Sequence, residues 1–169
     1  MTSAEERRQR PFSIQPLPAF LGDTRQNKLL YVLKAWLLIF VPTVALSMLL
    51  AQVPNAPAGP EFGATGLTLL FLLAVFAPVS ETLLMVPPLL LMDRLVGPRL
   101  AAAGSAILWG VLHSLASPLW GLIAWWPFLI FSAILLVWRR EKGLLPAMLI
   151  VTAVHALQNG IVGSTLLLE

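Results

Sequence analysis

The stretch LLPAMLIVTAVHALQNGIVGSTL at residues 144–166 decides the fold class. It has no charged side chain, yet His155 and Asn159 lie near its centre. A helix that crosses the hydrocarbon core of a bilayer needs about 20 mostly apolar residues. The stretch therefore predicts a membrane-spanning helix that carries polar side chains at mid-membrane depth.

Four further stretches have the same length and apolar character, and together with residues 144–166 they predict about five transmembrane helices. They are separated by short polar or Pro/Gly-containing segments, with no internal repeat and no second domain. We expect an all-α polytopic membrane helix bundle at 29–169 as a single domain, preceded by a polar cytoplasmic segment at 1–28. The four additional spans are expected at 29–50, 66–92, 100–117 and 119–138.

The composition supports this fold class. Of the 169 residues, 58% are hydrophobic and 11% are charged, whereas an ordinary soluble domain has about 25% charged residues. Such a chain cannot cover a globular surface with polar groups, which excludes a soluble enzyme and a disordered chain. The chain has no cysteine, which excludes a thiolate nucleophile and a cysteine-ligated zinc site.

The basic residues predict the orientation in the membrane. Ten of the eleven lie in the first 28 residues, between the second and third spans, or between the fourth and fifth spans, and the eleventh is Lys34 near the start of the first span. The other connecting segments have none. By the positive-inside rule, the N-terminus is cytoplasmic. The positive net charge therefore indicates topology rather than nucleic-acid binding, and we expect a multi-pass protein of the bacterial inner membrane.

Four strongly polar side chains are predicted inside the membrane, on three different spans: Glu81, His113, His155 and Asn159. With a helical rise of 1.5 Å per residue, they lie roughly 16, 20, 16 and 22 Å from the cytoplasmic ends of their spans. Ionisable residues in hydrocarbon are costly and face the bundle interior. The shared depth therefore predicts that the four side chains form one site.

A carboxylate beside a histidine can hold and deprotonate water, while a second histidine and an amide can donate hydrogen bonds to a developing oxyanion. This combination predicts hydrolysis of an amide bond without a covalent intermediate. Three alternatives remain open. Glu81, His113 and His155 could ligate Zn²⁺ with an open position for water, although no HExxH helix is present. The polar residues could join helices by hydrogen bonds. They could also relay protons, against which the absence of an inverted repeat argues.

Three short motifs carry a resemblance to a known family: PVSETLLMV at 78–86, WGVLH at 109–113 and HALQN at 155–159. They are similar to the motifs PxxEExxxR, FxxxH and HxxxN of the CPBP (ABI, or type II CAAX prenyl protease-like) intramembrane proteases. The resemblance covers about residues 66–162. It departs from the family at the second glutamate and the arginine of the first motif, which are Thr82 and Val86 here.

The resemblance implies a role for each residue. Glu81 would be the water-activating base, His113 would share that water, and His155 with Asn159 would form the oxyanion hole. The implied activity is an intramembrane endopeptidase that cuts near the C-terminus or leader of a peptide or membrane-anchored protein, with no required cofactor, although zinc stays open as an alternative.

The implied partners are membrane lipid and a hydrophobic peptide or membrane-anchored substrate, without nucleic acid. The sequence specifies no oligomeric state. Thr82 and Val86 motivate the alternative of a catalytically inactive protein of the same fold that acts as a binding, immunity or scaffold protein.

Overall fold

The computed structural model describes residues 14, 16–55, 57 and 59–166, and in these residues all regular structure is helical. The all-α prediction is therefore confirmed. Residues 1–13 of the predicted cytoplasmic segment, with Arg7, Arg8 and Arg10, lie outside the described residues. The elements are η1 (Ala19–Gly22), α2 (Lys28–Leu50), α3 (Gly66–Phe71), the π-helical turn η2 (Leu72–Phe76), α4 (Ala77–Val96), α5 (Pro98–Ser114), α6 (Pro118–Lys142) and α7 (Leu144–Thr165).

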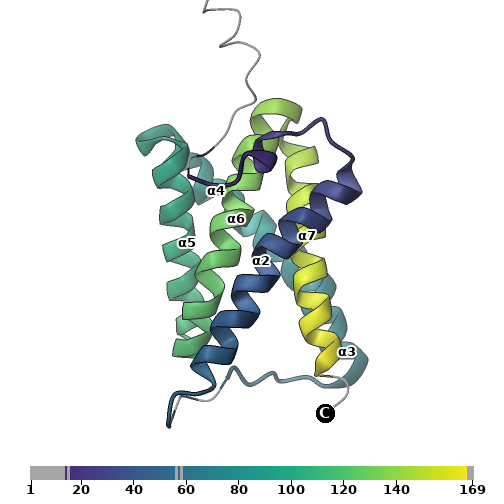
Figure 1. The fold of residues 1–169 in the computed structure, drawn as a ribbon, viewed down its shortest axis with the longest axis vertical. Helices are drawn as coiled ribbons and strands as arrows, with labels where there is room; N and C mark the ends of the chain where they lie inside the picture. Colours follow the sequence, from purple (N-terminus) through teal and green to yellow (C-terminus); the bar gives the residue numbers. More distant parts are fainter. Residues whose placement is uncertain (1–13, 15, 56, 58, 167–169) are drawn as a thin grey trace, which may run out of the picture.

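Four of the five predicted spans are long and apolar enough to cross a membrane: α2, the continuous helix at Gly66–Val96 formed by α3, η2 and α4, α6, and α7. The predicted span at 100–117 corresponds to α5, which has 17 residues at Pro98–Ser114 and is the shortest of the five. Successive helices run in opposite directions along the bundle (Figure 1).

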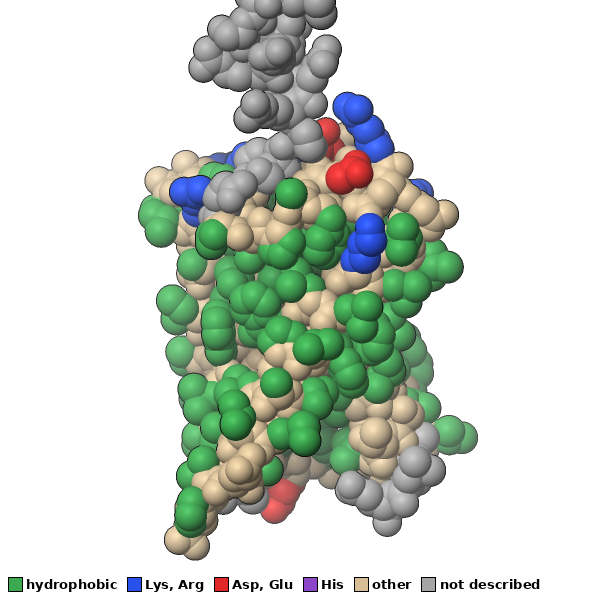
Figure 2. All heavy atoms as spheres, in the orientation of Figure 1, with side chains coloured by type: hydrophobic (Ala, Val, Ile, Leu, Met, Phe, Trp, Pro, Cys, Tyr) green, Lys and Arg blue, Asp and Glu red, His purple; other side chains and the backbone are tan. Residues whose placement is uncertain are grey.

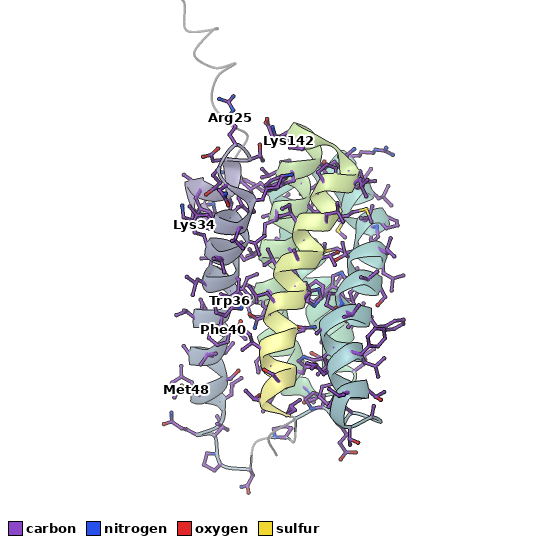
Figure 3. The ribbon with its side chains drawn as sticks, turned by 90° about the vertical axis from the view of Figure 1, so that its right-hand side faces the viewer. Arg25, Lys34, Trp36, Phe40, Met48 and Lys142 are labelled. Atoms are coloured by element: carbon purple, nitrogen blue, oxygen red, sulfur yellow. The ribbon has the colours of Figure 1, made fainter. Side chains whose placement is uncertain are left out.

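The described Lys and Arg side chains gather at one end of the molecule, while hydrophobic side chains cover its middle (Figure 2). Figure 3 shows Arg25 and Lys142 at this basic end and Met48 near the opposite end of α2. Lys34 reaches back along α2 toward the same end, where its Nζ lies 3.4 Å from Gln26 Oε1. This distribution is the one that the positive-inside rule associates with the cytoplasmic face.

Helix α6 is the central element of the bundle. In an apolar stretch of 18 residues of α6, 67% is buried inside the bundle, whereas the corresponding share for α2 is 17%. It packs against α2, α4, α5 and α7, whereas α2 contacts only α6, α7 and η1 among the described elements. The side chains of α6 therefore decide how the other helices are placed.

The chain before α2 is anchored to the basic end of α6. Tyr31 of α2 is fully buried, and its hydroxyl donates to the carbonyl of Leu21 in η1 at 3.0 Å. The Tyr31 ring makes an edge contact with Trp138 of α6, with ring centroids 5.1 Å apart. The described part of the predicted 1–28 segment thus packs on the helix bundle.

Two one-residue connections close the basic end. Gly97 between α4 and α5 has φ 80°, and Gly143 between α6 and α7 has φ 94°, a left-handed region that glycine adopts without the steric cost of a side chain. Asp93, at the end of α4, binds both Arg140 at 2.8 Å and Arg139 at 3.5 Å, at the end of α6. These ion pairs join the end of α4 to the end of α6, next to the two short turns.

A proline inside α2 creates a contact with α6. Pro42 has no N–H, so the Leu38 carbonyl one turn earlier loses its intrahelical donor. The indole N–H of Trp126 in α6 donates to this carbonyl at 3.0 Å. The contact supplies a partner to a backbone group that lipid could not hydrate.

This contact yields a stability prediction. Trp126→Phe removes the donor and keeps an aromatic ring, so we expect it to lower the free energy of unfolding by about 1–2 kcal/mol. In a Pro42→Ala background the residue 42 N–H can bind the Leu38 carbonyl, and the cost of Trp126→Phe should fall by at least about half. Denaturant titration of the four proteins in mixed micelles measures both costs.

Trp125→Phe is the matched control, because Trp125 is the neighbouring tryptophan, is 42% exposed and makes an edge contact with the Trp126 ring. We expect it to leave stability nearly unchanged. Equal costs of Trp126→Phe with and without Pro42 would show that the indole contributes by packing alone.

Candidate active site

Two of the predicted site residues lie one turn apart on α7. His155 is only 4% exposed, and Asn159 Nδ2 lies 3.2 Å from His155 Nε2. With the amide nitrogen toward the ring, Asn159 donates and Nε2 accepts, which places the imidazole proton on Nδ1. Because an amide nitrogen has two N–H groups, Asn159 can donate a second hydrogen bond.

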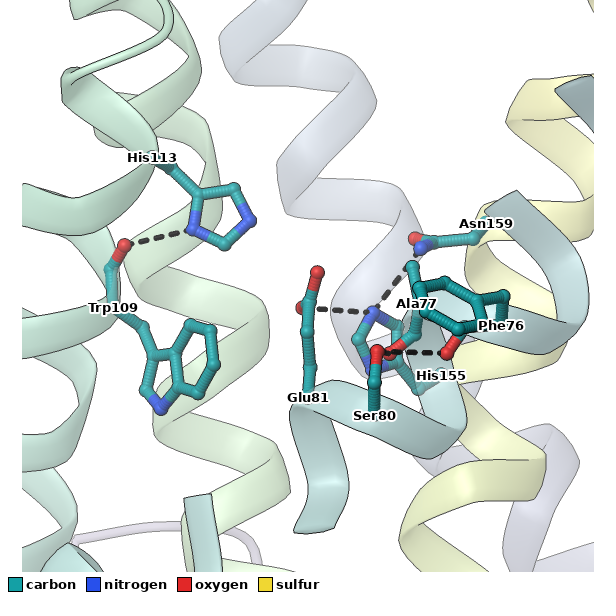
Figure 4. A network of polar contacts seen from close by, with 8 residues as sticks. All are labelled: Phe76, Ala77, Ser80, Glu81, Trp109, His113, His155 and Asn159. Atoms are coloured by element: carbon teal, nitrogen blue, oxygen red, sulfur yellow. Dashed lines mark hydrogen bonds and ion pairs between the residues drawn. The ribbon is translucent and has the colours of Figure 1, made fainter. Parts of the chain in front are cut away.

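Glu81 reaches this pair from α4. Its Oε2 lies 3.7 Å from His155 Nε2, and the atom is buried without a hydrogen-bond partner in the structure. The structure therefore brings three of the four predicted side chains together, the carboxylate, the imidazole and the amide (Figure 4). Because the His155 Nε2 lone pair is used by Asn159, the unpartnered Glu81 oxygen is the acceptor that remains for a water or ligand beside this pair.

A π-helical turn precedes Glu81 and sets its position. The Ala77 N–H donates to the Leu72 carbonyl five residues earlier rather than four, and Pro78 follows directly. Helix α7 packs on this turn, where a Cβ added at Gly163 would lie 3.3 Å from the side chains of Leu70 and Leu73. The wider turn and the glycine together allow α7 to bring His155 and Asn159 close to Glu81.

His113 lies on the other side of Glu81 from His155. Its Nδ1 lies 2.8 Å from the Trp109 carbonyl of the same helix, α5, so Nδ1–H is the donor and Nε2 carries the lone pair. In Figure 4 the ring is turned toward Glu81, and no direct hydrogen bond joins the two side chains. The structure thus places His113 beside the group of three without direct contact to it.

An aromatic wall on α6, formed by Phe128 and Phe131, contacts both imidazoles. Phe131 stacks on His155 with ring centroids 4.5 Å apart. Phe128 contacts His113 at 5.2 Å and His155 at 5.8 Å, and it stacks face to face on Trp109 at 4.5 Å. These rings fix both imidazole planes and keep the histidines apart.

The sequence analysis did not select Phe128 and Phe131 because apolar residues on an apolar span carry no distinguishing signal. The only available signal is their three-residue spacing, which puts them on one face of α6. That spacing does not reveal which face of the helix points toward the histidines.

The position of His113 depends on a close approach of α5 and α6. A Cβ added at Gly121 of α6 would collide with the Ser114 side chain and the Gly110 carbonyl of α5. The three-residue connection at 115–117 joins the two helices directly beyond this point. Glycine at 121 is therefore required for the α5–α6 distance that holds His113 at the site.

The arrangement bears on the zinc alternative. In the described part of the chain, no three His, Cys, Asp or Glu side chains are grouped closely enough to hold a metal ion. Glu81, His113 and His155 are therefore near one another without forming a three-ligand set. The groups that do converge are a carboxylate, which can accept a hydrogen bond from water, an imidazole, and an amide whose second N–H can donate to a carbonyl oxygen.

Comparisons with known proteins give no assignment. No family model matches the chain, and neither a curated protein nor a solved structure matches it. The resemblance to the CPBP proteases therefore stays a prediction from the three motifs.

The α5–α6 approach yields a second prediction. Gly121→Ala should push α5 away from α6, lower the free energy of unfolding by about 1–3 kcal/mol because the packed interface is overfilled, and displace His113. The measurement is thermal unfolding in detergent together with the chemical shifts of the two histidine rings, of which the His113 signals should move more. Gly59→Ala is the control, because nothing lies within 4 Å of a Cβ there; an equal loss in both variants would contradict the packing explanation.

Proposed function

We propose that this chain is an intramembrane endopeptidase that hydrolyses a peptide bond of a hydrophobic peptide or membrane-anchored protein. The observation that carries the proposal is the convergence of Glu81 Oε2, His155 Nε2 and Asn159 Nδ2 inside the helix bundle, with contacts of 3.7 and 3.2 Å. A carboxylate with a buried oxygen that has no partner is costly unless a ligand or water uses it. The motif resemblance and the long apolar helices also support this assignment.

Glu81 acts as the general base in the proposed reaction. It removes a proton from a water molecule, and the water oxygen attacks the carbonyl carbon of the scissile bond. His113 accepts the other hydrogen of the same water at Nε2, since its Nδ1–H is already bound to Trp109. The water is thereby held between two acceptors while it loses a proton to the carboxylate.

Asn159 stabilises the oxyanion in this scheme. One N–H holds His155, and the other donates to the oxygen that becomes negative in the tetrahedral intermediate. His155 accepts from Asn159 and so orients the amide rather than donating to the oxyanion itself. When the C–N bond breaks, Glu81 returns its proton to the leaving nitrogen, which gives a free carboxylic acid and a free amine.

A second function class has a specific observation in its favour. The first motif lacks its second glutamate and its arginine at Thr82 and Val86, and no hydrogen bond or ion pair joins His113 to Glu81 (Figure 4). These departures support a non-catalytic protein of the same fold that binds a peptide or a membrane protein. In that case Glu81, His155 and Asn159 join α4 to α7. Under either function we place the protein in the bacterial inner membrane.

Substitution of the proposed base separates the two classes. Glu81→Gln keeps the size of the side chain but removes the base, and it should lower peptide cleavage by about 10²–10⁴-fold. Asn159→Leu should lower it by about 10²–10³-fold through loss of the oxyanion donor. The measurement is the appearance of new peptide termini, by mass spectrometry, on membrane proteins reconstituted in vesicles with the purified chain.

Glu141→Gln is the matched control, since Glu141 is an exposed carboxylate at the basic end, and it should cleave at the wild-type rate. If Glu81→Gln cleaves as well as this control, the hydrolase proposal is wrong. If wild-type protein produces no new termini while Glu81→Gln retains biological activity in cells, the binding function is the correct class.

A further inference from the structure

An apolar groove lies on the side of the site that faces away from the basic end of the molecule. It has a volume of about 450 Å³ and is lined by Phe62, Gly63, Ala64, Leu69, Leu72, Leu73, Phe76, Ala77 and Trp120. This volume is within the range of pockets that hold small ligands or peptide side chains. None of the lining residues has a charged side chain, so the groove fits an apolar occupant.

The inner end of the groove reaches the candidate active site from two sides. Ala77 lies one helical turn before Glu81 on the same face of the Gly66–Val96 helix, as Figure 4 shows. Trp120 makes an edge contact with the His113 ring, with centroids 4.7 Å apart. An occupant of the groove would therefore end one helical turn from the proposed base and against the Trp120 ring that contacts His113.

The outer end of the groove is aromatic, and an exposed carboxylate precedes it in the chain. Phe62 makes an edge contact with Trp120, with ring centroids 5.9 Å apart. Glu61 precedes Phe62 and is exposed. In the described part of the chain, Glu61 is the only charged side chain at this end, because all the others lie at the basic end or, like Glu81, inside the bundle. A carboxylate beside exposed aromatic rings favours a cationic group.

The length of the groove limits what it can hold. From Leu69 to Ala77 the wall advances by eight residues, or roughly 12 Å along a helix. An extended polypeptide covers about 3.3 Å per residue, so roughly four residues fit between the rim and the site.

We propose that this groove binds about four consecutive apolar residues of a polypeptide substrate whose next residue outward is basic. The proposal rests on the proposed function, since it describes the substrate of the same site. The apolar residues lie on the non-cytoplasmic side of the scissile bond, and the basic residue pairs with Glu61. A lipid acyl chain is the competing occupant. If lipid fills the groove, a basic residue on a peptide gives it no advantage beside Glu61.

The absence of cysteine from the natural chain permits a direct test. Full-length protein with Ala64→Cys and Glu81→Gln is placed in vesicles with a synthetic Leu/Ala peptide about 20 residues long that begins Lys-Cys. A second probe begins Glu-Cys. Under a mild oxidant, we expect disulfide formation with the Lys-Cys probe to be about two- to fivefold faster than with the Glu-Cys probe. Adding Glu61→Gln should abolish the difference.

Leu115→Cys in place of Ala64→Cys is the matched control, because Leu115 is 80% exposed at the same end and does not line the groove. It should react with both probes at one rate. Equal rates of disulfide formation with both probes in the Ala64→Cys protein would overturn the proposal and indicate that lipid occupies the groove. Because Glu81→Gln removes the proposed base, cross-linking tests the groove proposal alone. Glu81-dependent cleavage without the probe preference would contradict the groove proposal and leave the proposed function standing.

Discussion

The burial of α6 among the other long helices is the constraint on which the rest of the structure depends. Lipid tails are as apolar as leucine, so a membrane protein cannot rely on the hydrophobic effect to bring its helices together. Close packing and hydrogen bonds between helices must do so instead. Helix α6 supplies both, through the approach of Gly121 to α5 and the indole contact of Trp126 with the Leu38 carbonyl.

A buried pair of serines continues this pattern. Ser132 of α6 donates to Ser105 of α5 at 2.9 Å, and both side chains are almost fully buried. Hydroxyl pairs of this kind join helices in a medium that offers no other partner. Because α6 is fixed on this side and by Asp93 at the basic end, its Phe128 and Phe131 rings are held where they contact both histidines.

The fold was largely predictable because its signal is physical and local. A bilayer requires long apolar segments, and charges between them mark one face, so the helices and the basic end follow from the residues alone. The helix ends do not follow in the same way. Helix α5 stops at Ser114 because the chain must turn before Pro118 begins α6. A run of apolar letters does not show where such a turn begins.

The candidate site was predictable in part for the same reason. Residues that share a depth, such as Glu81 and His155, are brought together once the helices stand side by side. Depth does not specify rotation about the helix axis, so it could not show that His113 would bind its own backbone at Trp109. Nor does the sequence show that the backbone before Pro78 widens into a π-helical turn, since that turn packs against α7.

The two positions at which the chain differs from the motif that it resembles lie in the same packed interior. Thr82 is 2% exposed and Val86 packs against the apolar core, so a glutamate and an arginine at these positions would be an ion pair deep in the bundle. Removing one partner of such a pair leaves an uncompensated charge, whereas replacing both with apolar or small residues is tolerated.

The chain has neither a glutamate at position 82 nor an arginine at position 86. Its Glu81 is therefore positioned by the π-helical turn and by its approach to His155 at 3.7 Å, while His155 is held by Phe131 stacking. Orientation of a buried acid by packing rather than by a neighbouring charge requires a rigid helix interface, which the central position of α6 provides.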